Sequence, residues 1–214
     1  MADHDLQFLK ATTQCMGLSL SDTQLEQLVG YVDLLEKWNR TYNLTAIRNR
    51  QEMLVRHVLE SLAIAPFIQG SKRLDVGTGA GVPGVPLAIA DTDSGYTLID
   101  SNGKKTRFLT EVKRQLGLTN IQIETARVES WVPDVIYDVV VTRAFADLNT
   151  TVNRIDHVLG REGSLYTMTT DSAAEVTTTM PANMELEEVQ EIRVPGQDWS
   201  FNLMKIRRSQ RDTS

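Results

Sequence analysis

A glycine-rich turn that directly follows a short apolar run is the feature that most constrains how this chain folds. The stretch RLDVGTGAGVPGVPLAIA covers residues 73–90. Its glycines fit two overlapping patterns, D-x-G-x-G-x-G and G-x-G-x-x-G, through the residues Asp75, Gly77, Gly79, Gly81 and Gly84. Glycines after a strand let the backbone of a βα turn approach a ligand closely. The turn therefore predicts a cofactor site, for either a methyl donor or a dinucleotide.

The rest of the chain after residue 72 alternates between short apolar runs and amphipathic segments. The expected strands are 73–76, 96–99, 120–123, 136–142 and 164–168, and the expected helices are 84–90, 103–116 and 148–159. That alternation predicts an open parallel sheet with helices on both faces. Two further runs, 186–194 and 199–207, are joined around Pro195-Gly196 and predict an antiparallel hairpin.

The first 70 residues are predicted to be helical. Apolar residues recur at helical spacing over 5–16, 22–39 and 51–65, and Ser21 is a plausible N-cap. We therefore expect a helical extension over residues 1–70, a cofactor-binding domain over 71–208 and a flexible tail over 209–214.

The charges near the turn distinguish the two candidate ligands. Asp75 would repel the pyrophosphate of a dinucleotide, whereas it suits the ammonium and sulfonium of S-adenosylmethionine, which has no phosphate. Asp100, at the end of the next strand, can accept hydrogen bonds from ribose in either ligand. Pro83 and Pro86 weaken the dinucleotide alternative, because proline offers no N–H group to a phosphate.

Composition limits the partners. The net charge of −6 gives no bulk attraction to nucleic acid, so RNA contacts must use local basic patches. The candidates for RNA binding are Arg40, Arg48, Arg50, Arg56, Lys104 and Lys105. Cys15 is the single cysteine, so neither an internal disulfide nor a cysteine metal cluster is expected, and we predict no metal. No apolar run is long enough for a membrane span and the N-terminus lacks signal-peptide features, so we expect a cytoplasmic protein.

Several blocks of the sequence match a known family. They are KWNRTYNLTAIR (37–48), MLVRHVLESL (53–62), LDVGTGAGVPGVPLAI (74–89), LIDSNGKKTRFL (98–109), RVES (127–130) and VVTRAF (140–145). The chain resembles the glucose-inhibited division protein B family from about residue 6 to residue 207. Its members are guanine-N7 methyltransferases of 16S ribosomal RNA.

The resemblance implies a class I Rossmann-like methyltransferase fold, S-adenosylmethionine as donor, and a guanine in the 530 loop of 16S rRNA, or of a small ribosomal subunit precursor, as target. The implied cofactor contacts are Asp75, Gly77, Gly79, Gly81, Val82, Asp100, Val128, Glu129 and Arg143. One departure is that Thr169 and Thr170 stand where the family usually has Lys and Gly. This departure concerns the contact with RNA rather than the cofactor.

The residues themselves agree with guanine N7 as acceptor. Methylation of a cytosine carbon needs a cysteine nucleophile, and Cys15 is remote in sequence from the turn. Exocyclic amines are often methylated beside an Asn/Asp-Pro-Pro-aromatic block, where this chain reads TRAF. Guanine N7 carries a free lone pair, so it needs positioning rather than a base. We expect Arg143 and Phe145 to provide that positioning.

Three alternatives stay open at this point. The first is a methyltransferase of the same fold that acts on a small molecule or a protein. The second is an NAD-dependent oxidoreductase that uses the other glycine pattern. The third is a non-catalytic RNA-binding protein, suggested by the departure at Thr169 and Thr170.

Overall fold

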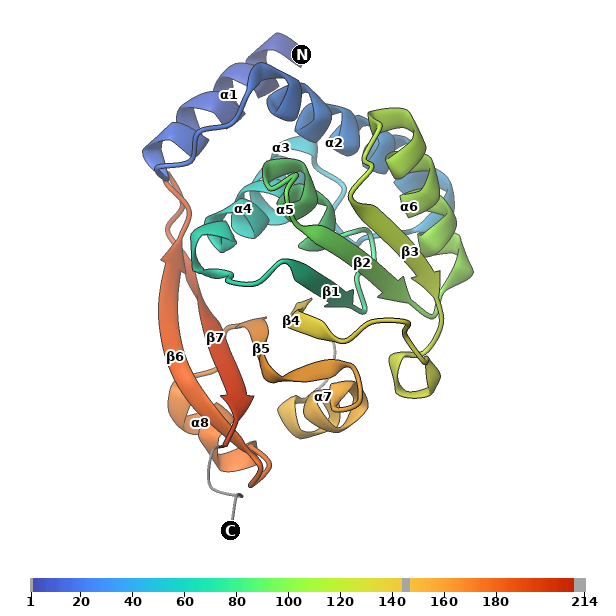
Figure 1. Ribbon diagram of the computed structural model, residues 1–214. Helices are drawn as coiled ribbons and strands as arrows, with labels where there is room; N and C mark the ends of the chain where they lie inside the picture. The colour runs from blue at the N-terminus through green and yellow to red at the C-terminus, as the bar shows by residue number, and fades with distance from the viewer. Residues whose placement is uncertain (1, 144–146, 210–214) are drawn as a thin grey trace.

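The fold is built on one seven-stranded sheet with the strand order β3-β2-β1-β4-β5-β7-β6 (Figure 1). The computed structural model describes residues 2–143 and 147–209. The strands are β1 (Lys72–Val76), β2 (Gly95–Asp100), β3 (Ile121–Thr125), β4 (Tyr137–Arg143), β5 (Leu159–Thr169), β6 (Met184–Arg193) and β7 (Ser200–Arg208). Strands β1 to β5 pair in parallel, and β7 pairs antiparallel with both β5 and β6. The predicted class I Rossmann-like architecture, a mostly parallel sheet that ends in an antiparallel hairpin, is confirmed.

Helices cover both faces of the sheet. They are α1 (Ala2–Cys15), α2 (Asp22–Tyr42), α3 (Arg50–Met53), the π-helix η1 (Leu54–Leu59), α4 (Glu60–Ala63), the 3-10 helix η2 (Ala65–Phe67), α5 (Gly84–Ala90), α6 (Gly103–Leu116), the 3-10 helix η3 (Val128–Ser130), α7 (Leu148–Ile155) and α8 (Ala173–Thr179). Helices α1 to α6 enclose one apolar core, and α7, α8 and η3 enclose a second core on the opposite face (Figure 1). Neighbouring residues of β4 alternate between the two cores, with Val139 and Val141 in the first and Val140 in the second, as the two-residue period of a strand requires.

Local sequence signals account for most element boundaries. Helices α5 and α6 have the predicted bounds, and α6 starts at the Asn102 cap and ends at Gly117 with φ of 65°. The predicted helix over 148–159 stops at Ile155, because β5 already begins at Leu159. Helix α8 lies between the expected strands 164–168 and 186–194, where no helix was predicted, and a capping box between Ser172 and Glu175 starts it.

The helical extension is packed directly onto the rest of the chain. The capping box that starts α2 pairs Ser21 with Gln24, as the Ser21 prediction required, and the Gln24 amide also donates to the last carbonyls of α5. The buried Tyr31 hydroxyl donates to the Ala80 carbonyl at 2.8 Å, which ties α2 to the glycine turn. Side chains from α2 and η1 share the first core with those from α5 and α6.

Arg50 joins three segments of the extension. Its guanidinium lies 2.7 Å from Asp5, 2.6 Å from Asp33 and 3.2 Å from Glu36, and its side chain is only 14% exposed. Asp5 is itself buried, so its carboxylate depends on Arg50 for compensation. The described helices include none that is both long and apolar enough to cross a membrane.

We expect Arg50→Ala to lower the free energy of unfolding by about 3 kcal/mol, because removing one partner of a buried ion pair leaves the other charge uncompensated. The matched control is Arg40→Ala, since Arg40 is 77% exposed and its one ion pair within the described part of the chain is with Glu36. The control should stay within about 0.5 kcal/mol of the wild type. Urea unfolding measures both, and equal effects would contradict this assignment.

Candidate functional site

The glycine turn has a backbone that other residues could not adopt without strain. After β1 ends at Val76, Gly77, Gly79 and Gly81 have φ of 67°, 59° and 94°, in the left-handed region that favours glycine. Gly84 is required for a different reason, because a Cβ there would lie 2.2 Å from Leu98 Cδ2 and 2.6 Å from Asp75 Oδ2. The turn is therefore held close against β1 and β2.

The carboxyl group of Asp75 holds this turn in place through hydrogen bonds. Its Oδ2 accepts hydrogen bonds from the Gly84 amide at 2.8 Å and from the Thr78 hydroxyl at 2.6 Å. The residue is 1% exposed, and its other oxygen, Oδ1, has no hydrogen-bond partner within the described structure. Burial raises the pKa of the Asp75 carboxyl to about 7, against the opposing effect of the two donors. Asp75 thus holds the turn in place through Oδ2, while Oδ1 remains without a hydrogen-bond partner among the described residues.

A cavity of about 280 Å³ lies at the carboxyl ends of β1, β2 and β3. Four of the predicted cofactor residues line it, namely Gly77, Asp100, Val128 and Glu129. The Asp100 carboxylate accepts from the Gly79 amide at 3.0 Å and from the Asn102 amide at 2.8 Å, and Lys105 Nζ lies 3.4 Å away. Ends of adjacent parallel strands are where open α/β sheets bind ligands.

The remaining predicted cofactor residues lie elsewhere. Asp75, Val82 and Gly81 are buried, and Gly81 packs so tightly that a Cβ would meet Val85 at 2.5 Å. Gly79 contributes its amide to Asp100. Arg143, at the end of β4, lines a second and larger cavity.

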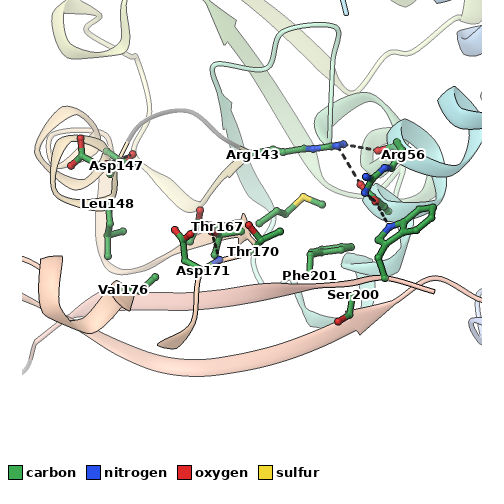
Figure 2. Close-up of a pocket in the computed structure, with 15 residues that line it drawn as sticks. Arg56, Arg143, Asp147, Leu148, Thr167, Thr170, Asp171, Val176, Ser200 and Phe201 are labelled. Atoms are coloured by element: carbon green, nitrogen blue, oxygen red, sulfur yellow. Dashed lines mark hydrogen bonds and ion pairs between the residues drawn. The ribbon is translucent and has the colours of Figure 1, made fainter. Parts of the chain in front are cut away.

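That larger cavity, of about 510 Å³, lies beyond the ends of β4 and β5 and beside the start of β7 (Figure 2). Glu60 is the centre of its wall: the carboxylate is 4% exposed and lies 2.8 Å from Arg56 Nη1, 3.2 Å from Arg143 Nη2 and 3.0 Å from Trp199 Nε1. Arg143 also donates to the Arg56 carbonyl at 2.5 Å, and the Arg56 guanidinium lies 4.4 Å above the Trp199 ring. The cluster thus holds two guanidinium groups at the cavity in a fixed arrangement.

Sequence reasoning missed Glu60 and Trp199. The i, i+4 spacing of Arg56 and Glu60 was an available signal for an ion pair. Trp199 had no such signal, because it meets Glu60 across 139 positions of the chain. The π-helical turn η1 carries Arg56, and single π-turns within helices are frequent at functional sites.

The predicted RNA-binding residues do not form one patch. Arg40 and Lys104 are exposed, and Arg48 is an exposed residue that donates to the Asn39 carbonyl and to Asn43 Oδ1. Arg50 is enclosed by carboxylates, Lys105 lies at the smaller cavity, and Arg56 lines the larger one. Phe145, the other predicted positioning residue, falls in 144–146, outside the described residues.

His57 is held as a neutral structural residue. Its Nε2 lies 3.0 Å from the Thr45 hydroxyl, and burial lowers the pKa of its ring to about 4. Within residues 2–143 and 147–209, no group of three or more His, Cys, Asp or Glu side chains is arranged to hold a metal ion.

Comparison with known proteins adds an independent result. A family model described as "GidB: rRNA small subunit methyltransferase G" matches residues 24–203. The chain is 44% identical over 191 residues to the ribosomal RNA small subunit methyltransferase G of Salmonella paratyphi B, covering 89% of this chain and 92% of the relative. The protein of the same name from Salmonella typhimurium gives the same values.

Solved structures share the fold at low sequence identity. A SAM-dependent methyltransferase from Aquifex aeolicus is 16% identical with a TM-score of 0.58, over 72% of this chain and 92% of that chain. The N-methyltransferase NodS from Bradyrhizobium japonicum, in complex with S-adenosyl-L-homocysteine, is 15% identical with a TM-score of 0.54, over 83% and 97%.

The raised pKa of Asp75 has a measurable consequence. Between the unfolded pKa of about 3.9 and the folded value of about 7, the folded state keeps a proton that the unfolded state has lost. Stability from this group is therefore lost as the pH rises. Asp75→Asn does not titrate, and its amide oxygen can keep both donors.

We therefore expect the stability difference between Asp75→Asn and the wild type to grow by about 1.4 kcal/mol per pH unit, from about pH 5 to about pH 7, and then to level off. Urea unfolding of both proteins over this range measures it. Other titrating groups cancel in the difference, so a constant difference would contradict the assignment.

Proposed function

This chain belongs to the GidB family of rRNA small subunit methyltransferases, and from that premise we propose that it methylates N7 of a guanine in the 530 loop of 16S rRNA, with S-adenosylmethionine as donor. The observation that carries the proposal is the smaller cavity. It combines a glycine turn with two acidic residues, Asp100 at the end of β2 and Glu129 in the loop after β3.

The smaller cavity has groups that fit the adenosine part of the donor. Asp100 would accept hydrogen bonds from the ribose hydroxyls, and Val128 and Glu129 would border the adenine. Gly77 brings the backbone of the turn to the same cavity. The free, buried Oδ1 of Asp75 fits the cationic amino-acid end of the donor better than it would fit a phosphate. When bound, S-adenosylmethionine supplies the electrophilic methyl group.

The start of α5 argues against a dinucleotide. A pyrophosphate needs free amide groups at a helix N-terminus. Here the Gly84 amide already donates to Asp75, the Val85 amide donates to the Gly81 carbonyl at 2.7 Å, and Pro83 and Pro86 have none. The NAD-dependent alternative therefore has little support at this turn.

The larger cavity has the features expected for the acceptor. It lies beside the smaller one at the same edge of the sheet, and its wall carries Arg56 and Arg143. His57 is neutral and hydrogen-bonded to Thr45, and Cys15 is exposed at the end of α1. These placements fit an acceptor that needs alignment rather than a base or a thiolate nucleophile, as guanine N7 does.

The contacts to RNA follow from exposure. We assign them to Arg40, Arg48 and Lys104, which are exposed, and to Arg56 at the larger cavity. Arg50 and Lys105 are assigned to the extension and to the smaller cavity instead. A methyltransferase of this fold that acts on a small molecule or a protein would not need these basic residues. Methyl incorporation into small ribosomal subunits distinguishes that alternative from an rRNA methyltransferase.

We expect the protein to bind S-adenosylmethionine, and not NAD, in titration calorimetry. Asp100→Asn should weaken binding by about 10-fold or more, because a charge-assisted acceptor for the ribose is lost. The matched control, Asp93→Asn, changes an exposed acid in the loop before β2 and should bind like the wild type. Binding of NAD in place of the methyl donor would refute this assignment.

We expect methyl groups to enter small ribosomal subunits that lack the modification, and the product to be cleaved by borohydride and aniline, as cationic N7-methylguanosine is. With no obligatory base, the single-turnover rate should vary much less between about pH 6.5 and 8.5 than the tenfold per unit that a base imposes. Because the pKa of Asp75 is about 7, the rate of Asp75→Asn tests whether any remaining dependence comes from this residue. A methyl group found on carbon or on an exocyclic amine would exclude the N7 reaction.

A further inference from the structure

Three carboxylates line the larger cavity, and two of them already form ion pairs or hydrogen bonds with protein groups. Glu60 is surrounded by Arg56, Arg143 and Trp199. Asp147 caps α7, where its Oδ1 accepts from the Thr150 amide at 2.9 Å. Glu60 has both carboxylate oxygens engaged and Asp147 has one, whereas the carboxylate of the third residue, Asp171, accepts no hydrogen bond from the described residues.

The backbone of Asp171 is fixed while its side chain is free. Its amide donates to the Thr169 hydroxyl at 3.0 Å, and its carbonyl accepts from the Asn202 side chain at 2.8 Å. Among the described residues, no hydrogen bond or ion pair reaches its carboxylate. Figure 2 shows Asp171 on the β5 side of the cavity, while Arg143 extends toward Arg56 on the other side. The preceding Thr169 and Thr170 bring no charge to it.

The strand order shows where Arg143 and Asp171 lie relative to the smaller cavity. The smaller cavity lies at the ends of β1, β2 and β3, and β4 is the next strand, followed by β5. Arg143, which ends β4, therefore stands between the smaller cavity and Asp171, which follows β5. A planar base in the larger cavity would have one edge toward the donor and Arg143, and the opposite edge toward Asp171. The volume of about 510 Å³ is within the usual range for a ligand site.

Guanine has the matching arrangement of groups. Its N7 and O6 lie on one edge as two acceptors, and the N1–H and N2–H donors lie on the opposite side of the ring. If N7 faces the donor, O6 is on the side of Arg143, whose guanidinium donates, and the two N–H groups face a carboxylate that only accepts. Adenine would present the unprotonated N1 to that carboxylate, which is repulsive.

We propose that Asp171 selects guanine by accepting hydrogen bonds from N1–H and N2–H of the target base. This inference rests on the proposed function, since it concerns the acceptor of the same reaction. Asp171 is then a specificity residue that touches the substrate, and Arg143 is its counterpart on the O6 side.

The test removes the N2 amino group from the substrate. Small subunits are reconstituted with 16S rRNA, assembled by ligation, that carries either guanosine or inosine at the target position. Single-turnover methylation is measured at subsaturating subunit concentration. Wild-type enzyme should methylate inosine about 10- to 100-fold more slowly than guanosine, the effect of losing a hydrogen bond to a charged group. Asp171→Ala should methylate the two at equal rates, close to the wild-type rate on inosine.

The controls separate recognition from structure. Asp147→Ala alters the other exposed carboxylate of the cavity and should keep the wild-type preference for guanosine over inosine. Asp171→Asn preserves the shape of the side chain but replaces one acceptor oxygen with a donor and removes the charge, so its preference should lie between those of the wild type and Asp171→Ala. Calorimetric affinity for S-adenosylmethionine should be unchanged in every variant, which shows that each one is folded.

Two results would overturn the inference. One is a wild-type enzyme that methylates guanosine and inosine equally, and the other is an Asp171→Ala variant that still prefers guanosine. Both leave the proposed function in place. If the wild type methylates neither substrate, the proposed function fails and the inference fails with it, which is a distinguishable outcome.

Discussion

The arrangement around the smaller cavity depends on one carboxylate oxygen, Oδ2 of Asp75. It holds the amide of Gly84 and the hydroxyl of Thr78, so it fixes both the start of α5 and the middle of the glycine turn. The amides of Gly77 and Thr78 then reach the Ile99 carbonyl on β2, at 2.9 and 3.2 Å. With the turn in that position, the Gly79 amide meets Asp100 at the tip of β2. Because Asp75 is buried, the loss of either donor would leave its carboxyl in the interior without one of its two compensating hydrogen bonds.

The helical extension contributes to the site as well as covering the sheet. Arg56 and Glu60 come from the extension and Arg143 from β4, while Trp199 directly precedes β7. Arg56, Arg143 and Trp199 all contact the buried carboxylate of Glu60. Tyr31 in α2 holds the glycine turn through Ala80. The cavity that would receive RNA is therefore assembled from segments on both sides of the predicted boundary near residue 70. That boundary separates elements of different type, but the extension and the sheet share one apolar core.

Sequence alone could predict the sheet, most helix bounds and the place of the smaller cavity. These depend on local signals, such as the caps of α6, the position of Asp100 at the end of β2 and that of Glu129 in the loop after β3. The larger cavity depends on tertiary contacts, such as that between Trp199 and Glu60, which produce no periodic pattern in the sequence. Charge counting could not show that Arg50 is neutralised, because its partner Asp5 lies 45 residues away. Asp171 was likewise missed, because it lies between the expected strands 164–168 and 186–194, where no element was predicted.

The direction of β7 affects the order in which the two cavities can be completed during synthesis. Because β7 runs against the parallel strands, its first residues, beside Trp199, lie at the edge where the parallel strands end. The residues that line the smaller cavity all lie from Val76 to Arg154, whereas the larger cavity needs Trp199, Ser200 and Phe201, which come later in the sequence. A nascent chain emerging from the ribosome can thus form the wall of the smaller cavity well before it can close the larger one. The larger cavity, to which we assign the ribosomal RNA, would therefore be the later of the two to be completed.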